Sequence, residues 1–206
     1  MTQRFDIHPQ NPQPRLVKQA VFMLRDGALG IYPTDSCYAF GCTLGNPQAA
    51  LEIARIRKTD KAHNFTLLCR DLSEIAIYAQ IENWSYRLLK AHTPGPYTFI
   101  LRATRDVPRR LQNPKQKTIG IRVPEHPVSK ALLTELSEPI MSSTLLLPNA
   151  ELPLNDPEEI FSRMSGEVGF FIASGSCGIE PTTVVDLTGE LPVVLRHGKG
   201  GAQAFE

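Results

Sequence analysis

The sequence predicts an α/β fold in which helices flank one mixed β-sheet. The chain of 206 residues is long enough for one sizeable hydrophobic core. Short apolar runs typical of strands recur along its whole length, and segments with helical periodicity separate them without strict alternation. Strict alternation would favour a purely parallel sheet, so we expect parallel and antiparallel strand pairs within a single domain.

The composition excludes several classes of protein. The net charge of +1 predicts no global field that would attract nucleic acid or a membrane, so any basic patch must be local. The N-terminus has no apolar signal region, and no apolar run reaches membrane-spanning length. The four cysteines form no C-x-x-C pair, which is typical of buried free thiols in a reducing cytosol. We therefore expect a cytoplasmic protein without a membrane partner.

The chain begins with a polar segment and a helix. Residues 1–14 contain three prolines, so we expect an extended N-terminal arm or linker before a domain that covers residues 15–206. A helix follows from Arg15, because apolar residues recur at helical spacing as far as Leu24. Gly27 stands where a helix commonly ends, since glycine adopts the left-handed conformation of that position.

Capping and turn residues define the remaining elements. Asn46, Asp71 and Asp156 each stand where a side chain can cap the first turn of a helix. Further helices are expected at residues 47–57, 71–79, from 83, at 127–136 and from 157, and strands at 29–32, 38–42, 64–69, 97–101, 118–123, 139–144, 168–173, 183–187 and 193–196. The turn at 188–190 makes the last two strands a hairpin.

Polar side chains stand at the ends of several apolar strands, where loops gather ligands on a rigid scaffold. These groups are Thr34–Ser36, Arg55 with Arg57, Arg122 with His126, and Ser142–Thr144; Thr182 with Thr183 opens a strand, and Arg196 closes one. The rigid turn before Thr98 could hold a substrate together with the Thr98 hydroxyl, and the alternative is a turn without a ligand. The histidines have no metal-ligand spacing with one another or with the cysteines, so we expect no metal site built by the protein itself. Common glycine-rich nucleotide motifs are also absent from the sequence.

The pair Arg55 and Arg57 has two interpretations. Residues two apart on a helix point to nearly opposite sides, so both arginines face one ligand only if the helix has already ended. Two guanidiniums beside a turn suit a triphosphate, because each can bind two oxygens. The alternative is a solvated helix end with a favourable dipole interaction.

One local charge bias is clear between residues 102 and 122. Its candidate RNA-binding residues are Arg102, Arg105, Arg109, Arg110, Lys115 and Lys117, and the single acid is Asp106. Such a patch can follow a phosphate backbone, whereas the absence of aromatic residues within it argues against base stacking. A solvated loop is the alternative.

The order of motifs along the chain resembles the YrdC/YciO family, and in particular its YciO branch. The matching motifs run from 33–42 through 55–57, 94–98, 121–127, 142–144 and 181–186 to 195–198. The resemblance implies a single YrdC-like domain, an open twisted mixed sheet with a concave basic face. Synthase members make threonylcarbamoyl-AMP and pyrophosphate from ATP, L-threonine and bicarbonate, so it also implies a nucleotide pocket, Mg²⁺ with the ATP, and double-stranded RNA or tRNA as a partner.

The resemblance assigns roles to individual residues. It implies Arg55 and Arg57 as catalytic residues; Arg55, Arg57, Ser142, Thr144 and Arg196 as ATP-binding; and Thr34, Thr98, Arg122 and Thr182 as threonine-binding residues. Two positions depart from the synthase pattern. Arg55 replaces the lysine of a Lys-x-Arg motif, and Leu146 replaces the asparagine of a Ser-Thr-Ser-Ala-Asn motif.

These departures leave alternative functions. The loss of one hydrogen-bond donor to a developing charge costs roughly 3 to 4 kcal/mol, which predicts a weak or divergent nucleotidyltransferase of the synthase type. The second hypothesis is a non-catalytic protein that binds double-stranded or ribosomal RNA through the same face. A third is a pocket for another nucleotide or acyl donor.

Overall fold

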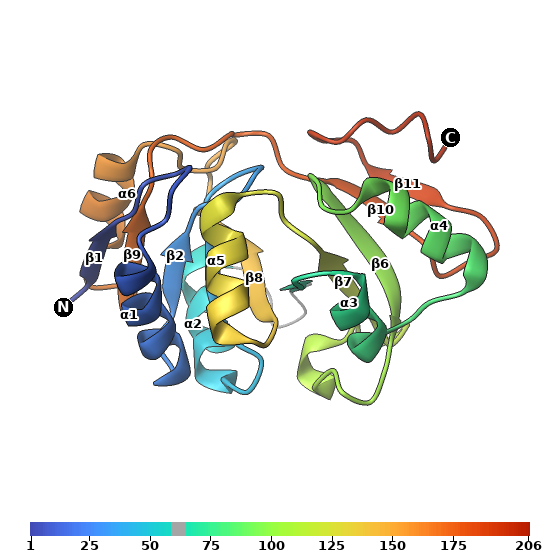
Figure 1. Cartoon of the computed structure of the whole chain (residues 1–206), viewed down its shortest axis with the longest axis horizontal. Helices are drawn as coiled ribbons and strands as arrows, with labels where there is room; N and C mark the ends of the chain where they lie inside the picture. Colours follow the sequence, from blue (N-terminus) through green and yellow to red (C-terminus); the bar gives the residue numbers. More distant parts are fainter. Residues whose placement is uncertain (59–64) are drawn as a thin grey trace.

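One mixed sheet runs through the whole molecule (Figure 1). The structure is a computed structural model and describes residues 1–58 and 65–206. Apart from β5 (Ala79–Gln80), which pairs with β6, the strand order is β1-β9-β2-β3-β8-β4-β7-β6-β10-β11. The strands are β1 (Gln3–Asp6), β2 (Gly30–Tyr32), β3 (Ala39–Thr43), β4 (Thr66–Leu68), β6 (Tyr97–Ala103), β7 (Thr118–Arg122), β8 (Ile140–Thr144), β9 (Phe170–Ala173), β10 (Thr183–Asp186) and β11 (Val193–Arg196).

The sheet contains both kinds of strand pair, as the irregular order of elements predicts. The pairs β1 with β9, β2 with β9, β4 with β7, and β6 with β10 are parallel. The pairs β2 with β3, β3 with β8, β4 with β8, and β6 with β7 are antiparallel, and β10 and β11 form the expected antiparallel hairpin. The prediction of an α/β domain around a mixed sheet is confirmed.

Six α-helices accompany the sheet in the described residues, and most begin at the expected caps. They are α1 (Pro14–Arg25), α2 (Pro47–Arg57), α3 (Leu72–Tyr78), α4 (Asn83–His92), α5 (Pro127–Leu136) and α6 (Pro157–Met164). Asn46, Asp71 and Asp156 each accept a hydrogen bond from a backbone N–H of the first turn. His126 caps α5 in the same way through Nδ1, so this candidate site residue has a local structural role. No helix in the described part of the chain is long and apolar enough to cross a membrane.

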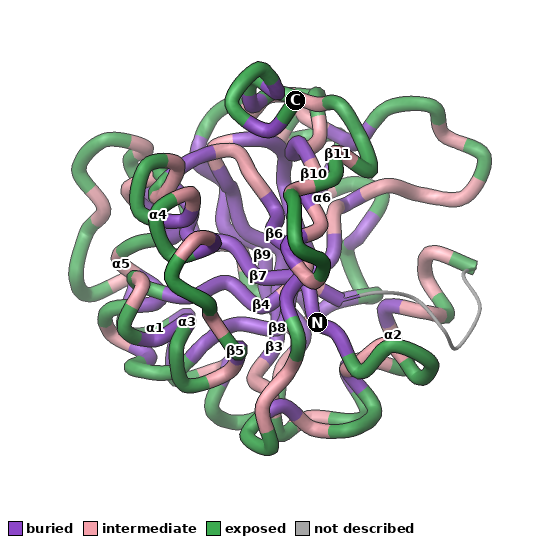
Figure 2. Tube along the Cα trace, turned by 90° about the vertical axis from the view of Figure 1, so that its right-hand side faces the viewer, coloured by how far each residue is buried: buried purple, intermediate pink, exposed green. Residues whose placement is uncertain are grey.

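Strand side chains alternate between two hydrophobic cores. Leu67 and Met141 belong to a core that includes residues of α2, α3, α4 and α6. Their neighbours Leu68 and Ile140 belong to a second core with α1 and α5. Figure 2 shows the buried strands in the interior, with α1 and α5 on one side and α2 on the other. The second core reaches from β1 to β4 and contains no residue of β6, β7 or β10.

The prediction of an N-terminal arm outside the domain is wrong. Gln3–Asp6 forms β1, an edge strand that pairs with β9, so this segment is part of the domain. Phe5 and Ile7 are buried in the core under α1, and the Thr2 hydroxyl donates to the Val168 carbonyl. The three prolines lie after the strand, where they shape the connection to α1 and leave β1 free to pair.

Candidate functional site

A cavity of about 390 Å³ lies where the second core ends. Strand register gives Arg122 the same orientation as Leu68, and Gly120 the same orientation as Thr66. Residues of this orientation on β4, β6, β7 and β10 form the cavity wall, and among them only Leu68 also belongs to the second core. The volume is within the range of small-molecule sites, roughly 300 to 1,000 Å³.

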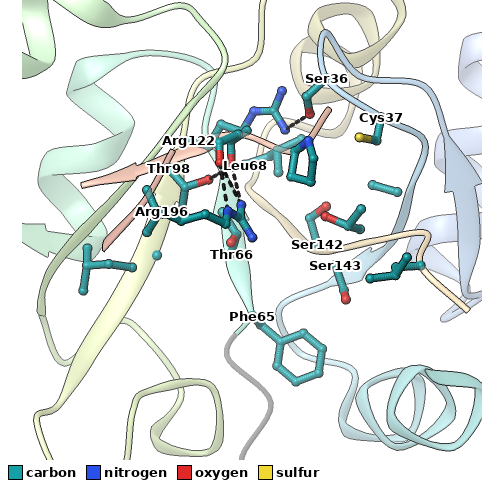
Figure 3. Close-up of a pocket in the computed structure, with 18 of the residues that line it drawn as sticks. Ser36, Cys37, Phe65, Thr66, Leu68, Thr98, Arg122, Ser142, Ser143 and Arg196 are labelled. Atoms are coloured by element: carbon teal, nitrogen blue, oxygen red, sulfur yellow. Dashed lines mark hydrogen bonds between the residues drawn. The ribbon is translucent and has the colours of Figure 1, made fainter. Parts of the chain in front are cut away.

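The cavity has two ends. Thr118 and Arg122 are four residues apart on β7, which is roughly 13 Å along a strand. The Arg122 end also contains Thr98 and Thr182, and the Thr118 end contains Arg57. Figure 3 shows Arg122, Thr98 and Arg196 close together beside Ser36, with Phe65 and Ser143 farther down. An elongated ligand can therefore contact both ends.

Arg122 is held in place at its end of the cavity. Its Nη1 donates to the Ser36 hydroxyl at 3.0 Å, and its Nη2 donates to Asp35 Oδ1. The ion pair is almost completely buried, and Asp35 does not line the cavity. Lys199 donates from Nζ to the Asp35 backbone carbonyl, which connects the C-terminal segment to the β2–β3 loop. Arg122 is thus a rigid part of the wall whose charge Asp35 largely balances.

The side chains of Thr98, Thr182 and Arg196 form a second cluster at the same end. The two threonine hydroxyl oxygens are 2.8 Å apart, and Arg196 donates from Nη2 to the Thr182 carbonyl at 2.8 Å (Figure 3). Burial lowers the pKa of Arg196. Arg196 was assigned to ATP, but the structure places it beside the predicted threonine-binding residues.

Thr34 shapes the loop between β2 and β3. Its hydroxyl donates to the Cys37 carbonyl at 2.6 Å and accepts from the backbone N–H groups of Ser36 and Cys37. This is a turn stabilised by a side-chain hydroxyl. Thr34 lines the cavity, but its hydroxyl already makes the hydrogen bonds that stabilise the loop. Its contribution is to position Ser36 and Cys37.

Arg57 places its guanidinium group at the Thr118 end of the cavity. Its Nη1 donates to the Ser143 hydroxyl at 2.5 Å, and its Nε donates to the Leu146 carbonyl at 3.3 Å. Burial lowers the pKa of Arg57. Leu146 lines the cavity, so the position that resembles the synthase asparagine lies at the site.

The hydroxyls of β8 divide between two roles. Ser142 accepts a hydrogen bond from the Tyr32 hydroxyl at 2.7 Å and donates to the Phe40 carbonyl, so it joins three strands within the sheet. Ser143 points the other way and contacts Arg57, and Thr144 lines the cavity. All three residues line the cavity. The resemblance assigns ATP binding to Ser142 and Thr144 and not to Ser143, although the alternation of strand side chains was the available signal.

Arg55 lies outside the cavity, contrary to the prediction. Helix α2 continues through Arg57, so the two arginines point to different sides, and Arg55 is exposed and donates to Glu167 at 2.7 Å. This is the geometry that a continuous helix dictates. Arg55 is therefore removed from the proposed catalytic and ATP-binding residues.

The basic run borders the Thr118 end. Arg102, Arg105, Arg109, Arg110, Lys115 and Lys117 are all exposed. They lie at the end of β6 and in the connection to β7, and Asn113 and Gln116 of this same connection line the cavity. The exposed basic residues are therefore continuous with the rim of the cavity.

The wall of the cavity has few carboxylates to hold a metal ion. Glu151 and Asp186 line it, and the described residues contain no group of three or more His, Cys, Asp or Glu that could hold a metal. Mg²⁺ commonly keeps several waters and binds through one or two carboxylates plus substrate phosphates. These residues fit an Mg²⁺ ion that a triphosphate brings with it.

The fold and the cavity define a single-domain α/β protein with an arginine-lined site on a mixed sheet. The chain belongs to the Sua5/YciO/YrdC family, whose profile carries the description "Telomere recombination" and matches residues 22–198. An uncharacterized protein of Haemophilus influenzae is 53% identical over the full length of both chains. The crystal structure of Escherichia coli YciO is 50% identical, covers all of both chains and has a TM-score of 0.96.

More distant relatives include proteins with a named activity. The threonylcarbamoyl-AMP synthase of Aliivibrio fischeri is 28% identical over 176 residues, which are 82% of this chain and 93% of that protein. The crystal structure of P. abyssi Sua5 complexed with L-threonine has a TM-score of 0.87 at 22% identity, and the match covers 96% of this chain and 58% of Sua5. The Sua5 match shows a shared fold.

Proposed function

We propose that this protein binds ATP and L-threonine in the cavity and has a weak or divergent threonylcarbamoyl-AMP synthase activity. The observation that carries the proposal is the grouping of Arg57, Arg122 and Arg196 in one two-ended cavity with several hydroxyl groups. The reaction joins ATP, L-threonine and bicarbonate and releases pyrophosphate. The name of the Aliivibrio fischeri relative and the L-threonine in the Sua5 complex support this choice of reaction.

We assign the nucleotide to the Thr118 end. The half-buried guanidinium of Arg57 attracts phosphate oxygens more strongly than a fully solvated one, because the local dielectric is lower. Ser143 and Thr144 offer hydroxyls beside it. When bound with the triphosphate, Mg²⁺ supplies further neutralisation of charge. Arg57 then orients the α-phosphate toward the other end of the cavity.

We assign the amino acid to the Arg122 end. The hydroxyls of Thr98 and Thr182 can donate to a carboxylate or accept from a substrate hydroxyl. Arg196 beside them lies where the developing charge of the adenylate would be shared between the two substrates. Catalysis of this kind depends mainly on positioning and on neutralisation of charge.

Leu146 is the reason to expect a slow reaction. Leu146 lines the cavity, and a leucine side chain cannot donate the hydrogen bond that an asparagine amide would provide. Removal of one such donor lowers a rate by roughly two to three orders of magnitude. The positive charges of Arg57 and Arg196 and the positioning of the two substrates would support the activity that remains.

The test is pyrophosphate release from ATP in the presence of L-threonine and bicarbonate. The wild-type chain should show a threonine-dependent rate that Arg57→Ala removes. Arg55→Ala is the matched control, since it removes the same charge two residues away and outside the cavity. A rate that is independent of threonine, or that falls equally in both variants, would reject the proposal.

RNA binding without catalysis is the second candidate. The observation that favours it is the row of exposed basic residues along the Thr118 end. Binding to duplex RNA or tRNA should depend on salt and weaken when Arg109 and Arg110 become alanine. The double variant Arg15→Ala/Lys18→Ala removes two exposed charges from α1 and should bind as wild type. Equal affinity of all three proteins would exclude this interface. Either function places the protein in the cytoplasm, where it meets ATP and RNA.

A further inference from the structure

The edge of the sheet at β1 is open in the part of the chain that the structure describes. β1 pairs there with β9 alone, and Figure 1 shows it at the outer edge of the sheet beside α1 and α6. The backbone N–H groups of Gln3 and Ile7 donate to carbonyls of the β9 segment. Because backbone groups alternate in direction along a strand, those of Arg4 and Asp6 point outward. A row of outward backbone groups can pair with a further strand.

A groove of about 480 Å³ lies beside this edge. Gln3 and Phe5 of β1 line it together with Phe22 and Met23 of α1. Phe22 is 71% exposed, although it lies beside an open groove that could bury an aromatic ring. An exposed aromatic side chain within an apolar groove is typical of an interaction surface. The groove shares no residue with the cavity of the candidate functional site.

The side chains of β1 divide between the two faces of the sheet. Phe5 is buried under α1, whereas Arg4 contacts α6, where it donates to Glu158 and lies over the Phe161 ring. Asp6 is exposed, and its carboxylate forms an ion pair with Arg4 at 3.0 Å. The edge therefore presents one positive and one negative side chain, placed symmetrically on either side of Phe5.

This order of charges favours one arrangement of two copies of the strand. A two-fold axis at Phe5 places Arg4 of each copy opposite Asp6 of the other. The outward backbone groups of these residues then form hydrogen-bonded pairs of the antiparallel type. An axis at Arg4 or at Asp6 would place like charges opposite each other, which is unfavourable. The edge is thus complementary to itself in backbone direction and in charge.

Helix α1 fits the same axis. An axis perpendicular to the sheet makes the two copies of α1 antiparallel. Arg15 and Phe22 both line the groove and are about two helical turns apart, so Arg15 of each copy lies toward Phe22 of the other. A guanidinium over an aromatic ring is a favourable contact. Lys18 lies nearer to the axis, where its long side chain can extend into solvent.

We propose that a second copy of this chain binds at this edge and groove, so that the protein forms a two-fold dimer through β1 and α1. In the dimer the two sheets join into one, and the groove of each copy covers Phe22 of the other. The cavity stays open, since no residue of β1 or α1 lines it. The dimer is therefore independent of the proposed function.

The experiment is analytical ultracentrifugation of the full chain from roughly 1 to 300 µM, where dimers with small interfaces dissociate. The wild-type chain should show a dimer fraction that rises with concentration. Phe22→Ala should raise the Kd of the dimer about tenfold or more, because apolar burial is lost in both copies. Leu51→Ala is the matched control, since it shortens an exposed apolar side chain on α2, and it should dimerise as wild type.

Exchange of the two charges tests the register of the strands. Asp6→Arg and Arg4→Asp each place like charges opposite one another at two points, and each should weaken the dimer by about five- to tenfold. The double variant Arg4→Asp/Asp6→Arg restores opposite charges and should dimerise within about threefold of wild type. A general loss of stability would not produce this recovery, and melting temperatures report that the variants are folded.

Four results would overturn the inference. The first three are a monomer at every concentration, equal dimerisation of Phe22→Ala and Leu51→Ala, and a double charge variant that dimerises as weakly as the single ones. The fourth concerns the other edge strand, β11, where Val193 is exposed. A dimer that persists in Phe22→Ala and is lost in Val193→Asp would place the contact at β11 and reject the one at β1.

Discussion

Leu146→Asn is the substitution that most directly tests why the reaction should be slow. Leu146 lines the cavity, while its backbone N–H donates to the Thr144 carbonyl and its own carbonyl accepts from Arg57. These backbone contacts do not depend on the side chain, so the substitution changes the wall without moving Arg57. The new amide would stand where the synthase motif has its asparagine.

The expected magnitude follows from two opposing effects. A correctly placed donor to a developing charge stabilises the transition state by roughly 3 to 4 kcal/mol, which corresponds to a rate increase of about 10² to 10³. Loss of a half-buried leucine side chain lowers the free energy of unfolding by about 1 kcal/mol. The rate effect is therefore much larger than the effect on the folded population.

The assay is threonine-dependent pyrophosphate release, with kcat and KM measured separately. Leu147→Asn is the matched control, because it introduces the same amide at the next half-buried position, which does not line the cavity. A folded Leu146→Asn protein that is no faster than wild type would refute the reasoning. An equal rate increase in Leu147→Asn would mean that the gain comes from weaker packing of this segment and not from the amide at position 146.

Leu145 should stay unchanged in these tests, since it is fully buried and Leu145→Ala would lower the free energy of unfolding by about 2 to 5 kcal/mol.

Three further predictions concern stability. Asp35→Asn removes one partner of a buried ion pair and should lower the free energy of unfolding by about 3 to 5 kcal/mol, measured by urea denaturation, whereas an unchanged value would mean that Arg122 finds another partner. Phe5→Ala should cost about 3 to 5 kcal/mol because β1 is part of the core, and a negligible loss would restore the view of residues 1–14 as an arm. Burial raises the pKa of Cys37 from 9.0 to about 11, so the folded chain binds this proton more tightly and stability falls as pH rises from 9 to 11. Cys37→Ser should reduce that fall, and identical pH profiles of the two proteins would contradict the assignment.

Local signals explain why much of the fold could be predicted. The caps at Asn46, Asp71 and Asp156 act within one turn, so their chemistry is readable from neighbouring residues. The turn at 188–190 likewise defines the β10–β11 hairpin. Strand β1 was missed because its pairing partner β9 is more than 160 residues away.

Some features of the candidate site could likewise be predicted from the sequence, and others depend on the tertiary structure. The sequence by itself determined the arginine and hydroxyl groups at strand ends and the apolar residue at Leu146, because residue type and order are local properties. Only the tertiary structure decided that Arg57 enters the cavity and Arg55 does not, since this depends on where α2 ends. It also decided that Asp35 pairs with Arg122 and that Lys199 contacts the Asp35 backbone carbonyl, because these groups come from separate segments of the chain. These decisions depend on side-chain direction and on contacts between distant segments, which sequence spacing does not encode.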